Sequence, residues 1–273
     1  MEKSKLSNRK LKAQRFQRPK LGDQPGTGWG KVAGWYDEVL KEEGSYQRDL
    51  ILPNLLRLMD IKRGETVLDL ACGQGFFAER FSRLGAKVIG TDIARELIEI
   101  AKKNPALEKA MLTVAPADKM PFVADHSVDK IAIVLALQNI ENVKEVFAEC
   151  ARVLKPKGKL FMILNHPAFR VLKESSWGND PATKVQYRRI DRYLSEARVK
   201  VAMHPGNKPG LMTVSFHRPF QFFFKALAKT GFVVSGLEEW SSNKQSQPGP
   251  RAEAENRARK EIPLFLYLEA TKP

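Results

Sequence analysis

The chain has 273 residues, of which 43% are hydrophobic and 28% are charged, as in a globular protein large enough to bury a substantial core. Its longest apolar stretches, such as IAIVLAL at 131–137, are too short to span a bilayer, and no apolar stretch follows the charged N-terminal residues as in a secretory signal. Two cysteines, Cys72 and Cys150, form neither a disulfide framework nor a metal-binding pair, so we expect a cytoplasmic protein without a bound metal.

The formal charge of +15 is concentrated at the N-terminus. Residues 1–20 contain eight Lys or Arg and one Glu, which gives +7 and leaves +8 for the other 253 residues. Such a segment is typical of a disordered tail, so we expect a basic tail and linker over 1–30 and one domain over 31–273. The tail could bring RNA close by neutralising phosphates, or it could serve only to keep the protein in solution.

Strands and helices alternate from residue 66 onward. Before that point, residues 34–60 are predicted to be helical, with Ile51, Leu55 and Leu58 on one apolar face. The next strands are predicted at 66–71, 87–92, 111–117, 128–137 and 159–166, and the helices at 76–84, 94–104 and 143–155. This alternation predicts an α/β fold with a doubly wound, mostly parallel sheet covered by helices on both faces.

The alternation breaks at residues 167–218. This insertion follows the fifth strand, at the edge where open α/β sheets bind ligands, and we predict that it forms a substrate lid with a hairpin-like pair of runs near its end. The rest of the chain is predicted as a helix at 219–231, a strand at 232–240, a loop at 241–260 and a last strand at 262–271. Because no helix is expected between the last two of these seven strands, we predict that the last one is antiparallel.

The stretch VLDLACGQGFFA at 67–78 carries the glycines of a nucleotide-binding turn. Gly73, Gly75 and Ala78 match the dinucleotide fingerprint, in which a helix N-terminus holds a pyrophosphate. Asp69 precedes the turn, where its carboxylate would repel a pyrophosphate and attract an ammonium group. Asp92 ends the second strand and is placed to accept hydrogen bonds from both hydroxyls of a ribose. Together they favour a ligand with a ribose and a cationic amino-acid end.

The chain resembles a class I S-adenosylmethionine-dependent methyltransferase of the type-11 group. The resemblance rests on VLDLACGQG (67–75), GTD (90–92) and three further segments. The segments are APADKMPF (115–122), VDKIAIVLALQNI (128–140) and ARVLKPKGKL (151–160). The resemblance covers roughly residues 34–165 and the terminal strands. It implies a Rossmann-like methyltransferase fold with S-adenosylmethionine as the cofactor.

The resemblance also implies which residues hold the cofactor. Asp69 would lie near its amino group, Asp92 at its ribose, and Asp118 at the adenine amine with Met120 packed on the ring. Leu135 to Gln138 would border the reactive methyl group. The full predicted cofactor set is Asp69, Ala71, Gly73, Gly75, Asp92, Ile93, Asp118, Lys119, Met120, Leu135, Tyr36 and Tyr46, the two tyrosines closing over the cofactor.

Candidates for contact with the methyl acceptor lie mostly in the insertion. Methyl transfer requires a general base only when the acceptor is weakly acidic, and His166 and His217 are the catalytic candidates for that role. The predicted substrate contacts are Gln138, Trp177, Tyr187, Arg188 and His204. Cys72 is predicted to be a packing residue, because no basic residue lies nearby in sequence to lower its pKa.

The leading functional prediction is methylation of a small molecule. An RNA methyltransferase that uses the basic tail is an alternative, although residues 137–140 (LQNI) lack the N-P-P-[YF] tetrapeptide common in enzymes that methylate nucleobase amines. A nicotinamide-dependent oxidoreductase would explain the glycines but not Asp69 or the ADKMPF segment. A non-catalytic nucleotide-binding or RNA-binding protein that keeps the fold also stays open.

Overall fold

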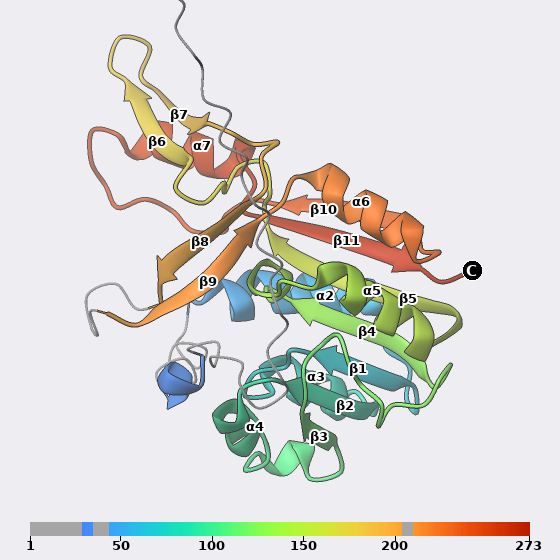
Figure 1. Cartoon of the computed structure of the whole chain (residues 1–273). Coiled ribbons are helices and arrows are strands. Elements are labelled where there is room, and N and C mark those ends of the chain that lie inside the picture. Colours follow the sequence, from blue (N-terminus) through green and yellow to red (C-terminus); the bar gives the residue numbers. More distant parts are fainter. Residues whose placement is uncertain (1–28, 35–43, 204–209) are drawn as a thin grey trace, which may run out of the picture.

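A seven-stranded sheet organises the molecule (Figure 1). The computed structural model describes residues 29–34, 44–203 and 210–273. The strands, in the spatial order β10-β11-β5-β4-β1-β2-β3, are β10 (Val233–Trp240), β11 (Phe265–Thr271), β5 (Leu154–Asn165), β4 (Val128–Val134), β1 (Thr66–Leu70), β2 (Lys87–Asp92) and β3 (Met111–Val114). Four strand pairs are parallel: β1–β2, β1–β4, β2–β3 and β4–β5. β11 is antiparallel to both of its neighbours, β10 and β5. The predicted fold class is confirmed.

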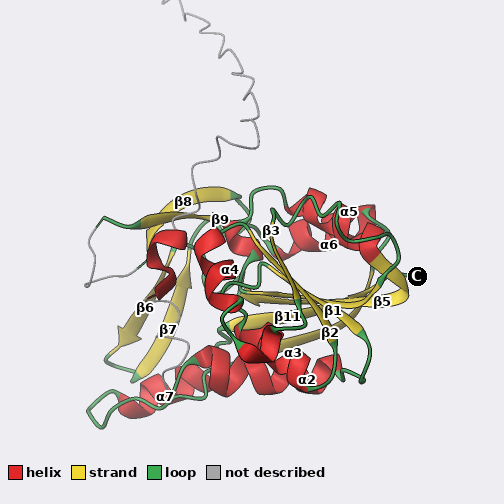
Figure 2. Ribbon diagram, turned by 90° about the horizontal axis from the view of Figure 1, so that it is seen from below, coloured by secondary structure: helices red, strands yellow, loops and turns green. Residues whose placement is uncertain are grey.

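Helices cover both faces of the sheet, with α5 and α6 on one side and α2 and α3 on the other (Figure 2). The helical elements are η1 (Gly30–Val32), η2 (Gln47–Ile51), α2 (Leu52–Met59), α3 (Phe76–Arg83), α4 (Arg95–Ala101), η3 (Pro105–Leu107), η4 (Leu137–Asn139), α5 (Val143–Val153), α6 (Phe220–Lys229) and α7 (Ala252–Glu261). Ile51 and Leu55 are fully buried as predicted, whereas Leu58 is half-buried and Met59 completes the apolar face. Within the described ranges, no helix is long and apolar enough to cross a membrane.

The prediction of a loop at 241–260 is wrong for its second half, because helix α7 forms there. Ala254 and Ala258 lie one turn apart and are buried, and pairs of opposite charge four residues apart line the exposed side. The Ser, Gln, Pro and Gly residues of 241–250 had suggested that the whole segment is irregular. The last strand is antiparallel as predicted, but the stated reason was wrong, since a helix does lie in the connection. It lies between β10 and β5 and runs antiparallel to both.

The predicted insertion forms two antiparallel hairpins. They are β6 (Ser175–Asp180) with β7 (Val185–Ile190), and β8 (Ala197–Ala202) with β9 (Met212–His217). Both lie beyond the carboxyl ends of the parallel strands (Figures 1 and 2). The hairpin-like pair of runs is therefore found at β8–β9, and β6–β7 is a second hairpin that the sequence did not reveal. Most of the predicted basic tail, residues 1–28, lies outside the described residues.

Candidate active site

The turn after β1 combines a tightly packed glycine with an open one. Ala71, Gly73 and Gly75 all have positive φ angles, of 60°, 56° and 83°. A Cβ atom on Gly75 would lie 2.6 Å from the side chain of Leu107, so packing excludes a side chain there. A Cβ atom on Gly73 would meet nothing within 4 Å. Gly73 therefore borders free space at the carboxyl edge of the sheet.

Two buried carboxylates flank this turn. Asp69 is only 2% exposed, and its Oδ2 atom has no hydrogen-bond partner among the described residues. Burial, opposed by the backbone N–H of Ala78 and assisted by the charge of nearby Asp92, raises the pKa of Asp69 to about 7. Asp92 accepts hydrogen bonds from the backbone N–H of Gly73 (2.9 Å) and of Ala94 (2.8 Å), and burial raises its pKa as well.

Other buried polar atoms in the same region also lack partners among the described residues. The side-chain nitrogen and oxygen of Gln74 and the hydroxyl of Thr91 have no such partner. Leaving such groups unsatisfied is costly, and Gln74 in the turn after β1 and Thr91 on the neighbouring strand β2 would, with Asp69, offer donors and acceptors to a polar ligand. The donor set fits the amino-acid and ribose ends of S-adenosylmethionine.

The residues predicted at the adenine end are not equally placed. Asp118 accepts a hydrogen bond from the side chain of Asn142 (2.9 Å), and Lys119 is exposed. Met120 is fully buried in the core cluster beside α5 and α6, which makes it a core packing residue in this structure. Ile93 is 41% exposed and offers apolar surface next to Asp92. Their contacts with adenine stay predictions.

Leu135 and Tyr46 occupy the rim of the same edge. Leu135 has a φ of 52°, and its carbonyl accepts a hydrogen bond from the side chain of Gln138 (2.6 Å), whose Oε1 is buried without a described partner. The Tyr46 hydroxyl bonds to the Ser242 hydroxyl (2.8 Å). The Tyr46 ring packs edge-on against Phe265, with centroids 5.6 Å apart. Tyr36 lies outside the described residues.

His166 has a structural environment. Its Nε2 lies 2.6 Å from the Glu239 carboxylate on β10, and its Nδ1 accepts a hydrogen bond from the backbone N–H of Phe169. The side chain is 1% exposed, and burial lowers its pKa despite the opposing effect of Glu239. Both ring nitrogens are engaged within the protein, so the structure does not support the predicted catalytic role of His166.

His217 is placed differently. It ends β9 in a row of buried polar residues on one face of that strand, with Ser215 donating a hydrogen bond to the Gln138 carbonyl (3.1 Å). The Nε2 of His217 lies 2.7 Å from the Tyr193 carbonyl. Because a carbonyl oxygen only accepts, Nε2 must carry the hydrogen and Nδ1 holds the lone pair in the neutral ring. The described residues offer Nδ1 no hydrogen-bond partner.

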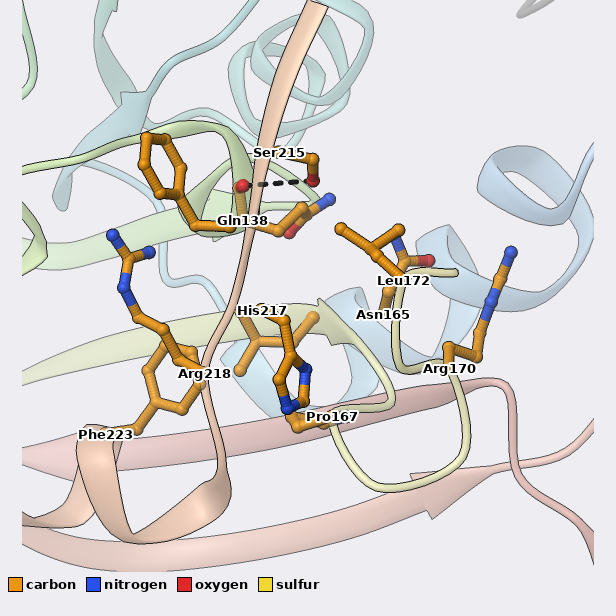
Figure 3. Close-up of a pocket in the computed structure, with 11 residues that line it drawn as sticks. Gln138, Asn165, Pro167, Arg170, Leu172, Ser215, His217, Arg218 and Phe223 are labelled. Atoms are coloured by element: carbon orange, nitrogen blue, oxygen red, sulfur yellow. Dashed lines mark hydrogen bonds between the residues drawn. The ribbon is translucent and has the colours of Figure 1, made fainter. Parts of the chain in front are cut away.

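A small cavity connects His217 with the end of β4 (Figure 3). Figure 3 shows the His217 ring beside Pro167 and Gln138 bonded to Ser215. The lining residues are Gln138, Leu164, Asn165, Pro167, Arg170, Leu172, Ser215, Phe216, His217, Arg218 and Phe223. Of the predicted acceptor-side residues, Gln138 and His217 meet here.

The other predicted substrate residues lie elsewhere. Trp177 and Tyr187 are 43% and 48% exposed on the β6–β7 hairpin and do not line the cavity. Arg188 donates hydrogen bonds to the carbonyl of Phe169 and the hydroxyl of Ser175. His204 falls outside the described residues.

Sequence reasoning missed several residues of the cavity, including Asn165, Arg170, Ser215 and Arg218. Alternation along β9 was the available signal for Ser215, since Ser215 and His217 must share a face of that strand. Nothing local marks Arg170 or Arg218, which reach the cavity through the way the insertion folds back on the sheet.

Comparison with known proteins agrees with this geometry. The sequence profile of the family described as "Methyltransferase domain" matches residues 68–162. In structure, the chain is similar to an S-adenosylmethionine-dependent methyltransferase from Mesorhizobium loti, with a TM-score of 0.64 and 26% identity, covering 80% of this chain and 96% of that one.

Two curated relatives are similar over part of the chain. A demethylmenaquinone methyltransferase of Tropheryma whipplei (strain Twist) is 32% identical over 112 residues, which cover 41% of this chain and 46% of that protein. A ubiquinone biosynthesis O-methyltransferase of Xanthomonas oryzae pv. oryzae (strain PXO99A) is 33% identical over 102 residues, 36% of this chain and 42% of that protein. The chain thus spans less than half the length of these curated relatives.

Proposed function

Because this chain belongs to the type-11 group of class I S-adenosylmethionine-dependent methyltransferases, we propose that it transfers a methyl group from that cofactor to a hydroxyl oxygen of a small molecule. The single observation that supports the proposed acceptor is the His217 imidazole. It lines a cavity at the carboxyl edge of the sheet, and its Nδ1 has no hydrogen-bond partner among the described residues. The printed names of the two curated relatives, which concern quinones, support a small-molecule acceptor.

The residues around the glycine turn suit the cofactor. S-adenosylmethionine, when bound, supplies an electrophilic methyl group on a sulfonium. The Asp69 carboxylate, whose Oδ2 is buried without a partner among the described residues, would pair with the ammonium group. Asp92 would accept hydrogen bonds from the ribose hydroxyls in addition to those from the backbone N–H groups of Gly73 and Ala94. Open space at Gly73 lets the ligand approach the backbone.

His217 would act as the general base. A hydroxyl is a weak acid, so removing its proton as the oxygen is methylated makes it a better nucleophile. Nδ1 would accept that proton, while the Tyr193 carbonyl holds the Nε2–H and keeps the ring in orientation. Gln138 lies across the cavity, where its unpartnered Oε1 can accept a hydrogen bond from the acceptor. The β8–β9 hairpin would exclude water from this space.

The test is transfer of a tritiated methyl group from labelled cofactor into separated metabolite, RNA and protein pools. We expect label in the metabolite pool. His217→Gln should lower the rate by about 10²- to 10⁴-fold, because a glutamine amide can still donate to the Tyr193 carbonyl but has no basic nitrogen. S-adenosylhomocysteine should bind the wild type and this variant equally in calorimetry, and NAD should bind neither.

Asp92→Ala is the matched control on the cofactor side, since it should weaken S-adenosylhomocysteine binding itself. Label in the RNA pool alone would replace the small-molecule proposal with the RNA alternative, for which the described residues supply no independent observation. Full activity of His217→Gln would remove His217 from the mechanism.

A further inference from the structure

Two neighbouring arginines, Arg170 in the cavity lining and Arg188 bonded to the carbonyl of Phe169, lack the ion pairs that other arginines of the chain make. Arg57, Arg83 and Arg152 each pair with a glutamate at 2.7–2.9 Å. Neither Arg170 nor Arg188 forms an ion pair with any carboxylate in the described part of the chain. Both come from the insertion, and both lie at the carboxyl edge of the sheet.

Arg188 is held rigidly. Its Nε donates to the carbonyl of Phe169 at 2.8 Å and one terminal nitrogen donates to the Ser175 hydroxyl at 2.6 Å. The guanidinium also lies over the ring of Trp177, 5.1 Å from its centroid. These contacts hold Arg188 against Phe169, the residue before Arg170. They use two N–H groups of the Arg188 guanidinium and leave its others without a hydrogen-bond partner among the described residues.

Arg170 lines the cavity and lies over the ring of Phe265, 6.0 Å from its centroid. Figure 3 shows its side chain directed away from His217. Arg170 is exposed, yet the atoms packed around its guanidinium lower its pKa, and the positive charge of Arg188 lowers it further. Lys244 lies over the ring of Tyr46, with its Nζ 4.6 Å from the ring centroid.

We propose that Arg170 and Arg188 together bind an oxyanionic group, a carboxylate or a phosphate, of the methyl acceptor. A planar guanidinium offers paired donors that match an oxyanion, and two of them can hold one group from two sides. Neighbouring like charges repel each other, and an anion between them converts that repulsion into attraction. The rings of Phe265 and Tyr46 beside Arg170 give an acceptor with a planar body an apolar surface.

The assignment of the anion to the methyl acceptor rests on the proposed function. The existence of an anion-binding site at Arg170 and Arg188 does not. Its position suits the assignment, because Arg170 lines the same cavity as His217 and Gln138. An acceptor anchored by its anionic end would present a hydroxyl to the base from a fixed distance. Specificity would then favour anionic acceptors over neutral analogues of the same shape.

The experiment is calorimetric titration of the full chain, saturated with S-adenosylhomocysteine, with three probes of similar shape: benzoate, phenyl phosphate and neutral benzamide. We expect at least one oxyanion to bind about tenfold or more tightly than benzamide, and the tighter of the two identifies carboxylate or phosphate. Arg170→Gln and Arg188→Gln should each weaken that oxyanion about tenfold or more. Arg170→Lys, which keeps the charge but loses the planar fork, should fall between.

Arg189→Gln is the matched control, because Arg189 is the exposed neighbour of Arg188 and already pairs with Asp191 at 3.0 Å. It should bind the oxyanion like the wild type. Equal loss in Arg189→Gln, equal binding of benzamide, or wild-type affinity in Arg170→Gln would each overturn the site. Melting temperatures and S-adenosylhomocysteine affinity check that Arg188→Gln still folds. If the wild-type protein binds S-adenosylhomocysteine but neither oxyanion, the anion site alone is refuted, whereas failure of the wild type to bind S-adenosylhomocysteine refutes the proposed function.

Discussion

At the scale of single residues, Asp69 links the cofactor site to pH. Its carboxyl is buried, and burial raises its pKa to about 7, so below that pH the free protein holds Asp69 largely protonated. An ammonium group placed beside it would favour the ionised form and lower the pKa again. Binding of a ligand with such a group must then expel the proton.

We therefore predict that S-adenosylhomocysteine binding releases close to one proton per site at pH 6 and almost none at pH 8.5. The sign follows from the raised pKa: at pH 6 the free carboxyl is protonated and the bound one is ionised, while at pH 8.5 both are ionised. Calorimetry in two buffers with different ionisation enthalpies measures the number. Asp69→Asn should release no proton from this site at either pH and should bind more weakly.

Asp92 complicates that measurement, because burial raises its pKa too. The Asp69→Asn variant separates the two, since any release that persists in it comes from elsewhere. Proton uptake at pH 6 in the wild type, or a release that the variant fully retains, would contradict the assignment of Asp69 to the ammonium end.

The site residues that could be predicted from the sequence are those whose position follows from a few neighbouring residues in the chain. Asp69, Gly73 and Asp92 sit at strand ends beside a glycine turn, and their positions follow from the strand–turn–helix pattern alone. His166 was placed at the correct edge, but its partner Glu239 lies on β10, 73 residues later in the chain, and no local pattern reveals that contact. Arg170 likewise depends on how the insertion folds.

At the scale of elements, the parallel strands were predictable because they are buried on both faces and read as continuous apolar runs. The β6–β7 hairpin was not, because SSWGND has little alternation and contains a glycine. The structure supplies the reason for that glycine: a Cβ on Gly178 would lie 2.4 Å from the ring of Tyr187 on the partner strand. The ring occupies the space that a side chain would fill, so tertiary packing compensates for a poor strand sequence.

Arg218 ties the insertion to the segment after β4. It is 6% exposed and donates hydrogen bonds to the carbonyls of Leu137, Ile140 and Glu141, at and just after η4. Its guanidinium also lies over the ring of Phe222, 5.0 Å from the centroid. One side chain thus satisfies three carbonyls of the segment that carries Gln138.

We predict that Arg218→Met lowers the free energy of unfolding by about 2–4 kcal/mol, because methionine keeps the apolar packing but removes the donor to the carbonyls of Ile140 and Glu141 and one of the two donors to that of Leu137. Urea denaturation measures the loss, and hydrogen exchange should rise across residues 137–141. Arg198→Met, at an exposed position of β8, is the control and should change stability by less than about 0.5 kcal/mol. Unchanged exchange at 137–141 would show that η4 does not depend on Arg218.

At the scale of the whole molecule, the two predicted sites share one edge of the sheet. The glycine turn follows β1, the acceptor cavity follows β4 and β5, and both hairpins lie beyond the same strand ends (Figure 2). Topology alone places the cofactor motifs there, since the carboxyl ends of parallel strands meet at one edge. The acceptor cavity depends in addition on the insertion, since Arg170, Ser215 and His217 come from it and line the cavity.

The distribution of charge leads to a prediction about the N-terminal tail. Residues 1–20 contribute +7 of the net +15, so a chain without them carries +8. Basic segments bind nucleic acid by releasing counterions, which makes the affinity fall steeply with salt. We predict that deleting residues 1–20 weakens binding of a fluorescent 20-nucleotide poly-U probe about tenfold or more at 50 mM salt, and much less at 200 mM. Fluorescence anisotropy measures both affinities.

A full-length variant with the eight tail Lys and Arg residues changed to Gln is the control for chain length. It should behave like the deletion if charge is the cause, because phosphate contacts need the cations and not the chain itself. Methylation of the small-molecule acceptor should be the same in all three proteins, since the tail precedes every residue assigned to the site. If poly-U binding survives in both variants, the RNA contact lies on the +8 remainder of the chain, and the tail then serves only solubility.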